Sequence, residues 1–147
     1  LEARPATFGD LLRLERVGLP ERYTAPGQPL RLRLVWRLAR PHDLDHNFFI
    51  HLIAADGRSA AQFDGPPLGL PEGGSSHASN AWRPGEAVLQ DIVLTLAADA
   101  APGEARLLHG WYDWRTGVRL PVSGSPDGAV ELGRIQIAPP PGAGAGG

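Results

Sequence analysis

The stretch PLRLRLVWRLAR, residues 29–40, alternates apolar and charged side chains with a period of two. The apolar positions of one face are Leu30, Leu32, Leu34, Trp36 and Leu38. The arginines of the opposite face are Arg31, Arg33 and Arg37. This period is typical of a half-buried β-strand and fits a helix poorly. We therefore expect Trp36 to lie in the core, and we expect the polar face to be partly covered at Val35.

Seven further stretches carry strand signals, and segments rich in proline and glycine separate them. These stretches are residues 10–19, 47–57, 59–65, 86–97, 104–113, 118–122 and 129–138. Asp56-Gly57 predicts a hairpin turn, and bulges are expected near Gln90 and Gly133. No stretch predicts a long helix. The pattern predicts an all-β fold, an antiparallel β-sandwich of about eight strands that is Ig-like or jelly-roll-like.

The length of the chain, 147 residues, suits one domain with a hydrophobic core. We expect residues 1–138 to form this single β-sandwich domain. Residues 139–147, PPPGAGAGG, have the composition of a tail or linker. The segment 65–84 is the longest irregular piece, and loops of that length are usually functional or mobile.

Charge and cysteine content exclude several classes of function. The formal net charge is −2, which indicates no basic surface for nucleic acid and no polybasic patch for a membrane. All 14 basic residues are arginine. Cysteine is absent, so the chain has no disulfide, no thiolate metal site and no cysteine nucleophile.

Three of the chain's aromatic residues fall within HGWYDWRTGVRLPV, residues 109–122. The pattern predicts a hairpin whose turn is DWRTG, with Gly117 suited to a positive φ. Alternation directs one of Trp111 and Tyr112 inward. Pro121 restricts pairing, so the return strand is expected to be short or at an edge. Trp114 lies in the turn itself, where an aromatic ring is not needed to fill the core.

The chain also resembles a known family through four segments: FFIHLIAADGRSAAQFDGPP, AWRPGEAVLQD, APGEARLLHGWYDWRTGVRLPV and LGRIQI. They are similar to the C-terminal extracytoplasmic β-sandwich of bacterial polytopic membrane glycosyltransferases of the dolichyl-phosphate-mannose mannosyltransferase-like type. The resemblance covers roughly Leu30 to Ile137. The matching positions include Phe49, His51, Asp64, Gly110, Tyr112, Thr116, Gly117, Arg119 and Pro121. The chain departs from the pattern at Ala105, where a tyrosine is usual, and at Trp114, where a small residue or proline is expected.

This resemblance implies an accessory domain. In that family the transfer chemistry belongs to the membrane-embedded part, which has no counterpart in these residues. The resemblance also implies a bacterial, extracytoplasmic location at the cell surface or in a secreted protein, with attachment to a membrane protein beyond these residues.

A glycan platform is the functional interpretation of the aromatic residues, because indole rings stack on the C–H faces of sugars. The candidate ligand-binding residues are Trp114, Trp111, Asp113, Arg119 and Trp82. The alternative is packing, with one ring of the hairpin in the core and Trp82 closing one end of the sandwich. Trp114 is the ring for which packing explains least.

Metal and catalytic signals are weak. His42 and His46 form the one local histidine cluster, which we expect to be solvated, while His51 and His109 are expected to be structural. Asp64 and Asp113 are expected to start turns and Asp91 to pair with an arginine. We therefore predict no metal site and no cofactor, and no motif fixes a reacting group of an enzyme.

Three classes of function follow. The first is a non-catalytic accessory domain that recognises or positions a glycan or a protein partner. The alternative is a structural surface or filament subunit that forms homo-oligomers through edge strands or terminal segments. A small enzyme is the third and weakest hypothesis, and nucleic acid is not expected as a partner.

Overall fold

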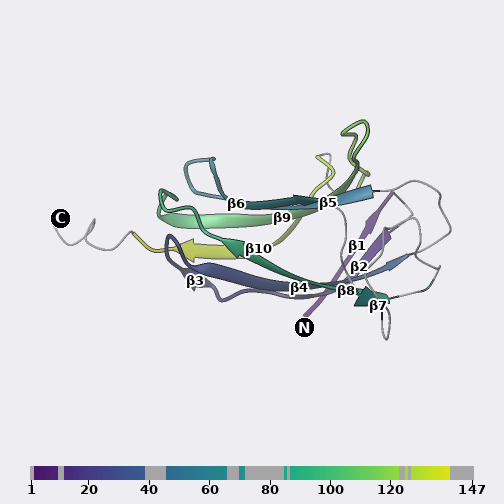
Figure 1. Cartoon of the computed structure of the whole chain (residues 1–147), viewed down its shortest axis with the longest axis horizontal. Helices are drawn as coiled ribbons and strands as arrows, with labels where there is room; N and C mark the ends of the chain where they lie inside the picture. The colour runs from purple at the N-terminus through teal and green to yellow at the C-terminus, as the bar shows by residue number, and fades with distance from the viewer. Residues whose placement is uncertain are drawn as a thin grey trace.

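The computed structural model describes residues 2–9, 12–38, 46–65, 70–71, 85, 87–122, 125 and 127–139. It forms two stacked β-sheets, as Figure 1 shows. Sheet A has the strand order β1-β2-β4-β8-β7. Its strands are β1 (Glu2–Phe8), β2 (Leu12–Gly18), β4 (Pro29–Leu38), β7 (Leu70–Pro71) and β8 (Ala87–Thr95).

Sheet B has the order β3-β10-β9-β5-β6. Its strands are β3 (Tyr23–Thr24), β5 (His46–Ile53), β6 (Ser59–Gly65), β9 (Gly103–Asp113) and β10 (Val130–Ile137). All pairings are antiparallel except the short β3–β10 pairing. The all-β sandwich fold is thus confirmed, with ten strands in the described residues instead of about eight. Among the same residues, no helix is long and apolar enough to cross a membrane.

The alternating pattern of residues 29–40 decides the centre of sheet A. β4 pairs with β2 on one side and with β8 on the other. Trp36 is fully buried, as predicted, and Val35 is covered on the outer face of the sheet. Leucines of β4 enter one continuous core together with residues of sheet B such as Phe48 and Leu107.

The differences from the sequence predictions have local causes. β1 was not expected, because it contains Pro5 and lacks clear alternation, whereas it forms an edge strand, where proline is tolerated. The bulge predicted near Gln90 is wrong: β8 pairs with β4 without a register shift, and Gln90 occupies a buried position and donates to the Asp91 carbonyl (3.0 Å). The bulge near Gly133 is confirmed by a register shift between Glu131 and Gly133.

Two hairpins were predicted, and one forms fully. β5 and β6 pair across a turn in which Gly57 has φ 83°. Residues 118–122 form only isolated bridges, of Arg119 with Tyr112 and of Val122 with Phe8 and Ser125, so the return strand is as short as Pro121 led us to expect. Residues 140–147 and nearly all of the segment 65–84 lie outside the described residues.

Replacement of core and turn tryptophans tests this arrangement. Trp36→Ala is expected to lower the free energy of unfolding by roughly 3 to 5 kcal/mol, because it leaves a large cavity in the core. Trp114→Ala is expected to cost less than about 1 kcal/mol, because that ring lies in an exposed turn. Denaturant melts of both variants measure the difference, and equal losses would contradict the burial assigned to one of the two rings.

Candidate functional site

The turn that follows β9, residues 113–117, is called the hairpin tip here and projects beyond sheet B (Figure 1). Asp113 organises it: its carbonyl accepts from the Gly117 N–H (2.7 Å), and its carboxylate accepts from the Arg115 N–H (2.8 Å). Gly117 has φ 76°, the left-handed conformation predicted for it. The expectation that Asp113 starts a turn is confirmed, and the tip holds a fixed backbone shape.

Trp114 is the aromatic residue of the hairpin tip. Its side chain is 51% exposed, and the guanidinium of Arg115 lies 4.7 Å from the ring centroid. A cation over one face of an indole restrains the ring, while the exposed half of its surface stays available for a ligand. The tip therefore presents a restrained aromatic surface.

Trp111 corrects the predicted glycan platform. Its ring is fully buried and packs 4.8 Å from the ring of Trp36, centroid to centroid. Alternation along β9 places Trp111 inward and leaves Tyr112 half-buried on the outer face. Trp111 thus offers no face to a sugar in this structure. Trp82, another candidate, lies outside the described residues.

Arg119 contributes mainly to packing. Its guanidinium lies 4.3 Å from the ring centroid of Phe49 and donates to the Asp127 carbonyl (2.9 Å). Phe49 faces outward from β5 yet is only 2% exposed, because Arg119 and the chain around Gly128 cover it. A ligand-binding role for Arg119 stays a prediction.

Residues of the family-like pattern gather on the outer face of sheet B. This outer-face cluster consists of Phe49, His51, Asp64, Gly110, Tyr112 and Arg119. Gly110 lies opposite Phe49 across the β5–β9 pairing, and a Cβ at Gly110 would approach the Phe49 ring to 2.5 Å. No other residue fits there without displacing Phe49. Packing therefore accounts for glycine at position 110.

One polar pair of the outer-face cluster remains accessible. His51 Nε2 lies 3.2 Å from Asp64 Oδ2, with the two side chains 24% and 38% exposed. The expectation that Asp64 starts a turn is wrong, because Asp64 lies within β6, opposite Phe49. Asp91 does pair with an arginine, since Arg33 donates to both of its carboxylate oxygens at 2.6 and 3.1 Å.

His109 is a fully buried histidine of the core. The Trp36 indole N–H donates to its Nε2 (3.0 Å), so its proton resides on Nδ1 and is donated to the Phe49 carbonyl (3.1 Å). Burial lowers the pKa of His109 to about 4, although the hydrogen bond to Phe49 opposes this shift. The expectation of a satisfied structural histidine is confirmed.

The remaining histidines are only partly described. His46 corrects a prediction, because it begins β5 and is buried, not solvated in a loop. His42 and His77 lie outside the described residues. Among the residues that the structure describes, no group of three or more potential metal-binding side chains occurs.

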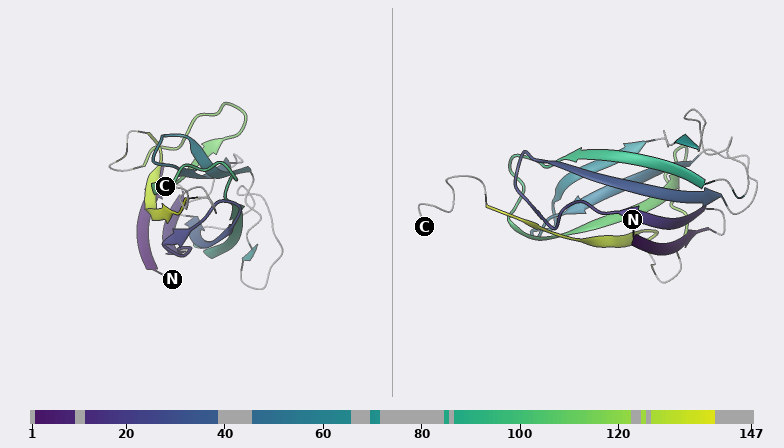
Figure 2. Two further views of the ribbon diagram at one scale, coloured as in Figure 1. Left: turned by 90° about the vertical axis from the view of Figure 1, so that its left-hand side faces the viewer. Right: turned by 90° about the horizontal axis from the view of Figure 1, so that it is seen from below.

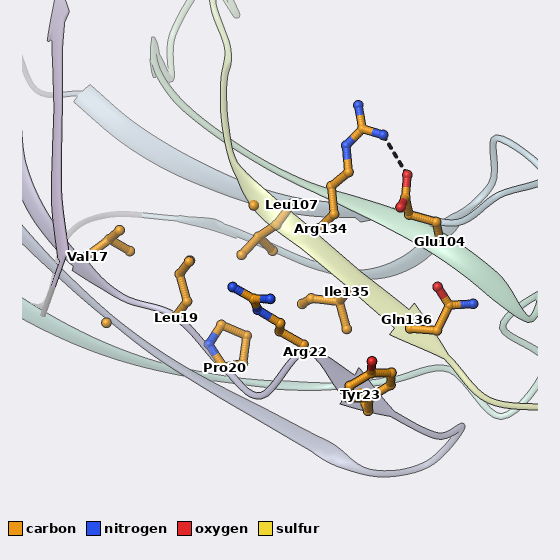
Figure 3. Close-up of a pocket in the computed structure, with 12 residues that line it drawn as sticks. Val17, Leu19, Pro20, Arg22, Tyr23, Glu104, Leu107, Arg134, Ile135 and Gln136 are labelled. Atoms are coloured by element: carbon orange, nitrogen blue, oxygen red, sulfur yellow. Dashed lines mark hydrogen bonds and ion pairs between the residues drawn. The ribbon is translucent and has the colours of Figure 1, made fainter.

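A groove that the sequence did not indicate runs along one edge of the sandwich (Figure 3). This edge groove has a volume of about 670 Å³. Val17, Leu107 and Ile135 form its apolar floor, and its rim carries Arg22, Tyr23, Glu104, Arg134 and Gln136. Tyr23 is 76% exposed, and Arg134 pairs with Glu104 at 2.5 Å. No local signal reveals the groove, because its walls come from β9, β10 and the segment between β2 and β3.

Comparison with known proteins shows the fold class. No protein-family model matches the chain, and no curated protein matches it by sequence. The C-terminal domain of Wzt superimposes with a TM-score of 0.54 at 11% identity, over 91% of this chain and 77% of that one. A CARDB domain of the PF1109 protein from Pyrococcus furiosus, solved with di-metal ions, gives 0.48 at 8% identity, over 94% and 93%. The similarity to the Wzt domain shows the β-sandwich fold alone.

The buried imidazole predicts a pH dependence of stability. Its pKa is about 6.5 in the unfolded chain and about 4 in the folded one, so the unfolded state binds the extra proton first as the pH falls. The contribution of neutral His109 is complete above pH ~6.5 and is lost progressively toward pH ~4, on the order of 3 kcal/mol.

Chemical denaturation across this pH range measures the effect. His109→Gln is expected to be less stable at neutral pH and to show a flatter slope than the wild type. Trp114→Ala is the control, because it removes no ionisable group, and it should retain the wild-type slope. A wild-type slope in His109→Gln would contradict the assignment.

Proposed function

We propose that this β-sandwich is a non-catalytic recognition domain that binds a glycan at its hairpin tip. The observation that carries the proposal is the half-exposed ring of Trp114, held against the Arg115 guanidinium. Sugar C–H groups stack on such rings, and a restrained ring loses little entropy on binding. The resemblance to accessory domains of membrane glycosyltransferases and an extracytoplasmic bacterial location are part of this proposal.

The arrangement of the described histidines favours binding over catalysis. Both ring nitrogens of His109 are occupied, by the Trp36 indole and the Phe49 carbonyl. His51 pairs with Asp64, and in the described part of the chain no serine or threonine hydroxyl completes this pair as a nucleophile. The tip itself supplies stacking and hydrogen-bonding groups but no general acid–base pair.

A glycan array with three proteins tests the proposal. Wild-type protein should bind at least one glycan class, and Trp114→Ala should lose about tenfold or more in affinity, as the loss of one stacking ring implies. Tyr23→Ala is the matched control, because Tyr23 is also an exposed aromatic residue but lies at the edge groove. Absence of binding by the wild type, or loss only in Tyr23→Ala, would overturn the tip as the glycan site.

A second candidate function is self-association through the edge of β10. The Gln136 N–H donates to the Arg22 carbonyl, and the Ala138 N–H donates to the Thr24 carbonyl. The short strand β3 therefore covers only the C-terminal end of this edge of β10. Alternation directs the Arg134 N–H to the same edge, where no described strand pairs with it. An extended segment from a second copy could add there, next to the edge groove.

Two variants at one position test this association. Arg134→Pro removes the outward N–H and leaves the β9 ladder intact, because the bonds of residue 134 face away from β9. Arg134→Ala removes the same ion pairs and keeps the N–H. Sedimentation velocity should show concentration-dependent association of the wild type and the alanine variant and a monomeric proline variant. A wild type that is monomeric at all concentrations would rule this function out.

A further inference from the structure

The outer face of sheet A collects five arginines. Arg13 and Arg16 extend from β2, and Arg31, Arg33 and Arg37 extend from the neighbouring β4. Four of the five are exposed, and Arg37 is half-buried. On β4 the period-two pattern turns these arginines to one side. On β2 a register shift between Leu14 and Arg16 brings Arg13 and Arg16, which are three residues apart, to the same side, and we call this surface the arginine face.

The register of the two strands arranges these charges in two dimensions. Arg13 lies directly opposite Arg37, and Arg16 lies opposite Val35. Arg31 and Arg33 are about 6.5 to 7 Å apart at their backbones, Arg33 and Arg37 are about 13 Å apart, and the two strands are about 4.8 Å apart. The positive charge is therefore spread over a surface instead of following a single line.

Carboxylates neutralise only part of this charge. Glu15 pairs with Arg37, and Asp91 pairs with Arg33. The Arg33 hydrogen bond lowers the pKa of Asp91, so that pair stays ionised at neutral pH. In the described part of the chain, Arg13, Arg16 and Arg31 have no carboxylate within ion-pair distance. Three positive charges without a carboxylate partner among the described residues thus share one face, although the net charge of −2 had indicated no polybasic patch for a membrane.

Packing requires apolar residues on the inner face of β2 and β4 but does not require arginine on the outer face. Arg13 lies opposite Arg37, whose charge Glu15 compensates, and like charges opposite each other on a sheet do not stabilise it. Two exposed apolar side chains of β8 lie on the same face. Val93 is 54% exposed opposite Arg31, and Leu89 is 36% exposed opposite Val35. An anionic surface would compensate the charges and cover these apolar side chains.

We propose that the arginine face docks on a membrane surface containing anionic phospholipid headgroups. The guanidiniums are spread in two dimensions, as are the phosphates of a membrane surface. A linear polyanion would contact mainly the arginines of a single strand. Arginine binds phosphate oxygens through paired N–H donors. Val93 and Leu89 lie beside the arginines and contact the headgroup region.

The size of the effect follows from the uncompensated charges. A basic residue near an anionic membrane contributes about 1 kcal/mol, so three unpaired arginines are expected to raise the partition coefficient roughly 100-fold. Salt weakens this attraction, because the Debye length shortens from about 10 Å at 0.1 M to about 3 Å at 1 M.

Vesicle co-sedimentation tests the proposal with matched variants. The probes are phosphatidylcholine vesicles with and without 30% phosphatidylglycerol. The wild type should bind only the anionic vesicles, and the triple variant Arg13→Gln, Arg16→Gln, Arg31→Gln should lose roughly 100-fold. The control triple, Arg22→Gln, Arg58→Gln, Arg106→Gln, removes the same charge from exposed positions elsewhere and should retain binding.

Several results would overturn the proposal. These are no wild-type binding to anionic vesicles, equal losses in both triple variants, and binding that 1 M salt leaves unchanged. Binding of soluble polygalacturonate through the same arginines, without vesicle binding, would assign the face to an acidic polymer instead. Trp114→Ala should bind vesicles like the wild type, so the test is independent of the glycan site. A denaturant melt of each variant confirms that it is folded.

Discussion

The hydrogen bond from the Trp36 indole to His109 joins the two sheets at the centre of the core. Trp36 belongs to β4 in sheet A, and His109 belongs to β9 in sheet B. Phe48 and Trp111 both pack 4.8 Å from the Trp36 ring, centroid to centroid. A buried imidazole without partners is costly, and both of its nitrogens are satisfied only when β4, β9 and β5 are in this alignment. The bond therefore fixes how one sheet lies on the other.

This constraint determines the roles of the residues around it. With His109 and Trp111 directed inward, Gly110 and Tyr112 must face outward along β9. Gly110 leaves space for the Phe49 ring, and Arg119 covers that ring from outside. Both faces of this part of β9 are thus occupied by the protein's own side chains. The exposed aromatic ring that follows this strand is Trp114, beyond the end of β9.

The sequence predicted those parts of the fold that depend on local alternation. The core position of Trp36, the turn at residues 113–117 and the bulge at Gly133 follow from period, turn chemistry and phase. β3 and β7 contain two residues each and exist only through their partners β10 and β8, so no local pattern marks them.

Gln90 and His46 illustrate a second limit of prediction from the sequence. Each is a polar residue in a buried position, and polarity alone suggested a bulge for one and solvent exposure for the other. The Gln90 side chain satisfies part of its hydrogen bonding on the backbone of its own strand, which makes burial tolerable. The candidate site was likewise predictable only in part. The hairpin tip could be predicted from its turn residues. The sequence could not decide whether Trp111 or Tyr112 points inward along β9, so the burial of Trp111 became clear only in the structure.

The distribution of arginines over the two faces could not be predicted without the register of the strands. A net charge sums over the chain, whereas the charge of a face depends on which strands are neighbours and which carboxylates they bring. On the outer face of sheet B, Arg134 meets Glu104 and Glu131, and Arg119 covers Phe49. On sheet A, Arg13, Arg16 and Arg31 lack such partners in the described residues. Because the outer faces of a sandwich point in opposite directions, as the stacked sheets of Figure 1 and the end-on view of Figure 2 show, the proposed membrane contact through sheet A would leave the hairpin tip of sheet B free for the proposed glycan.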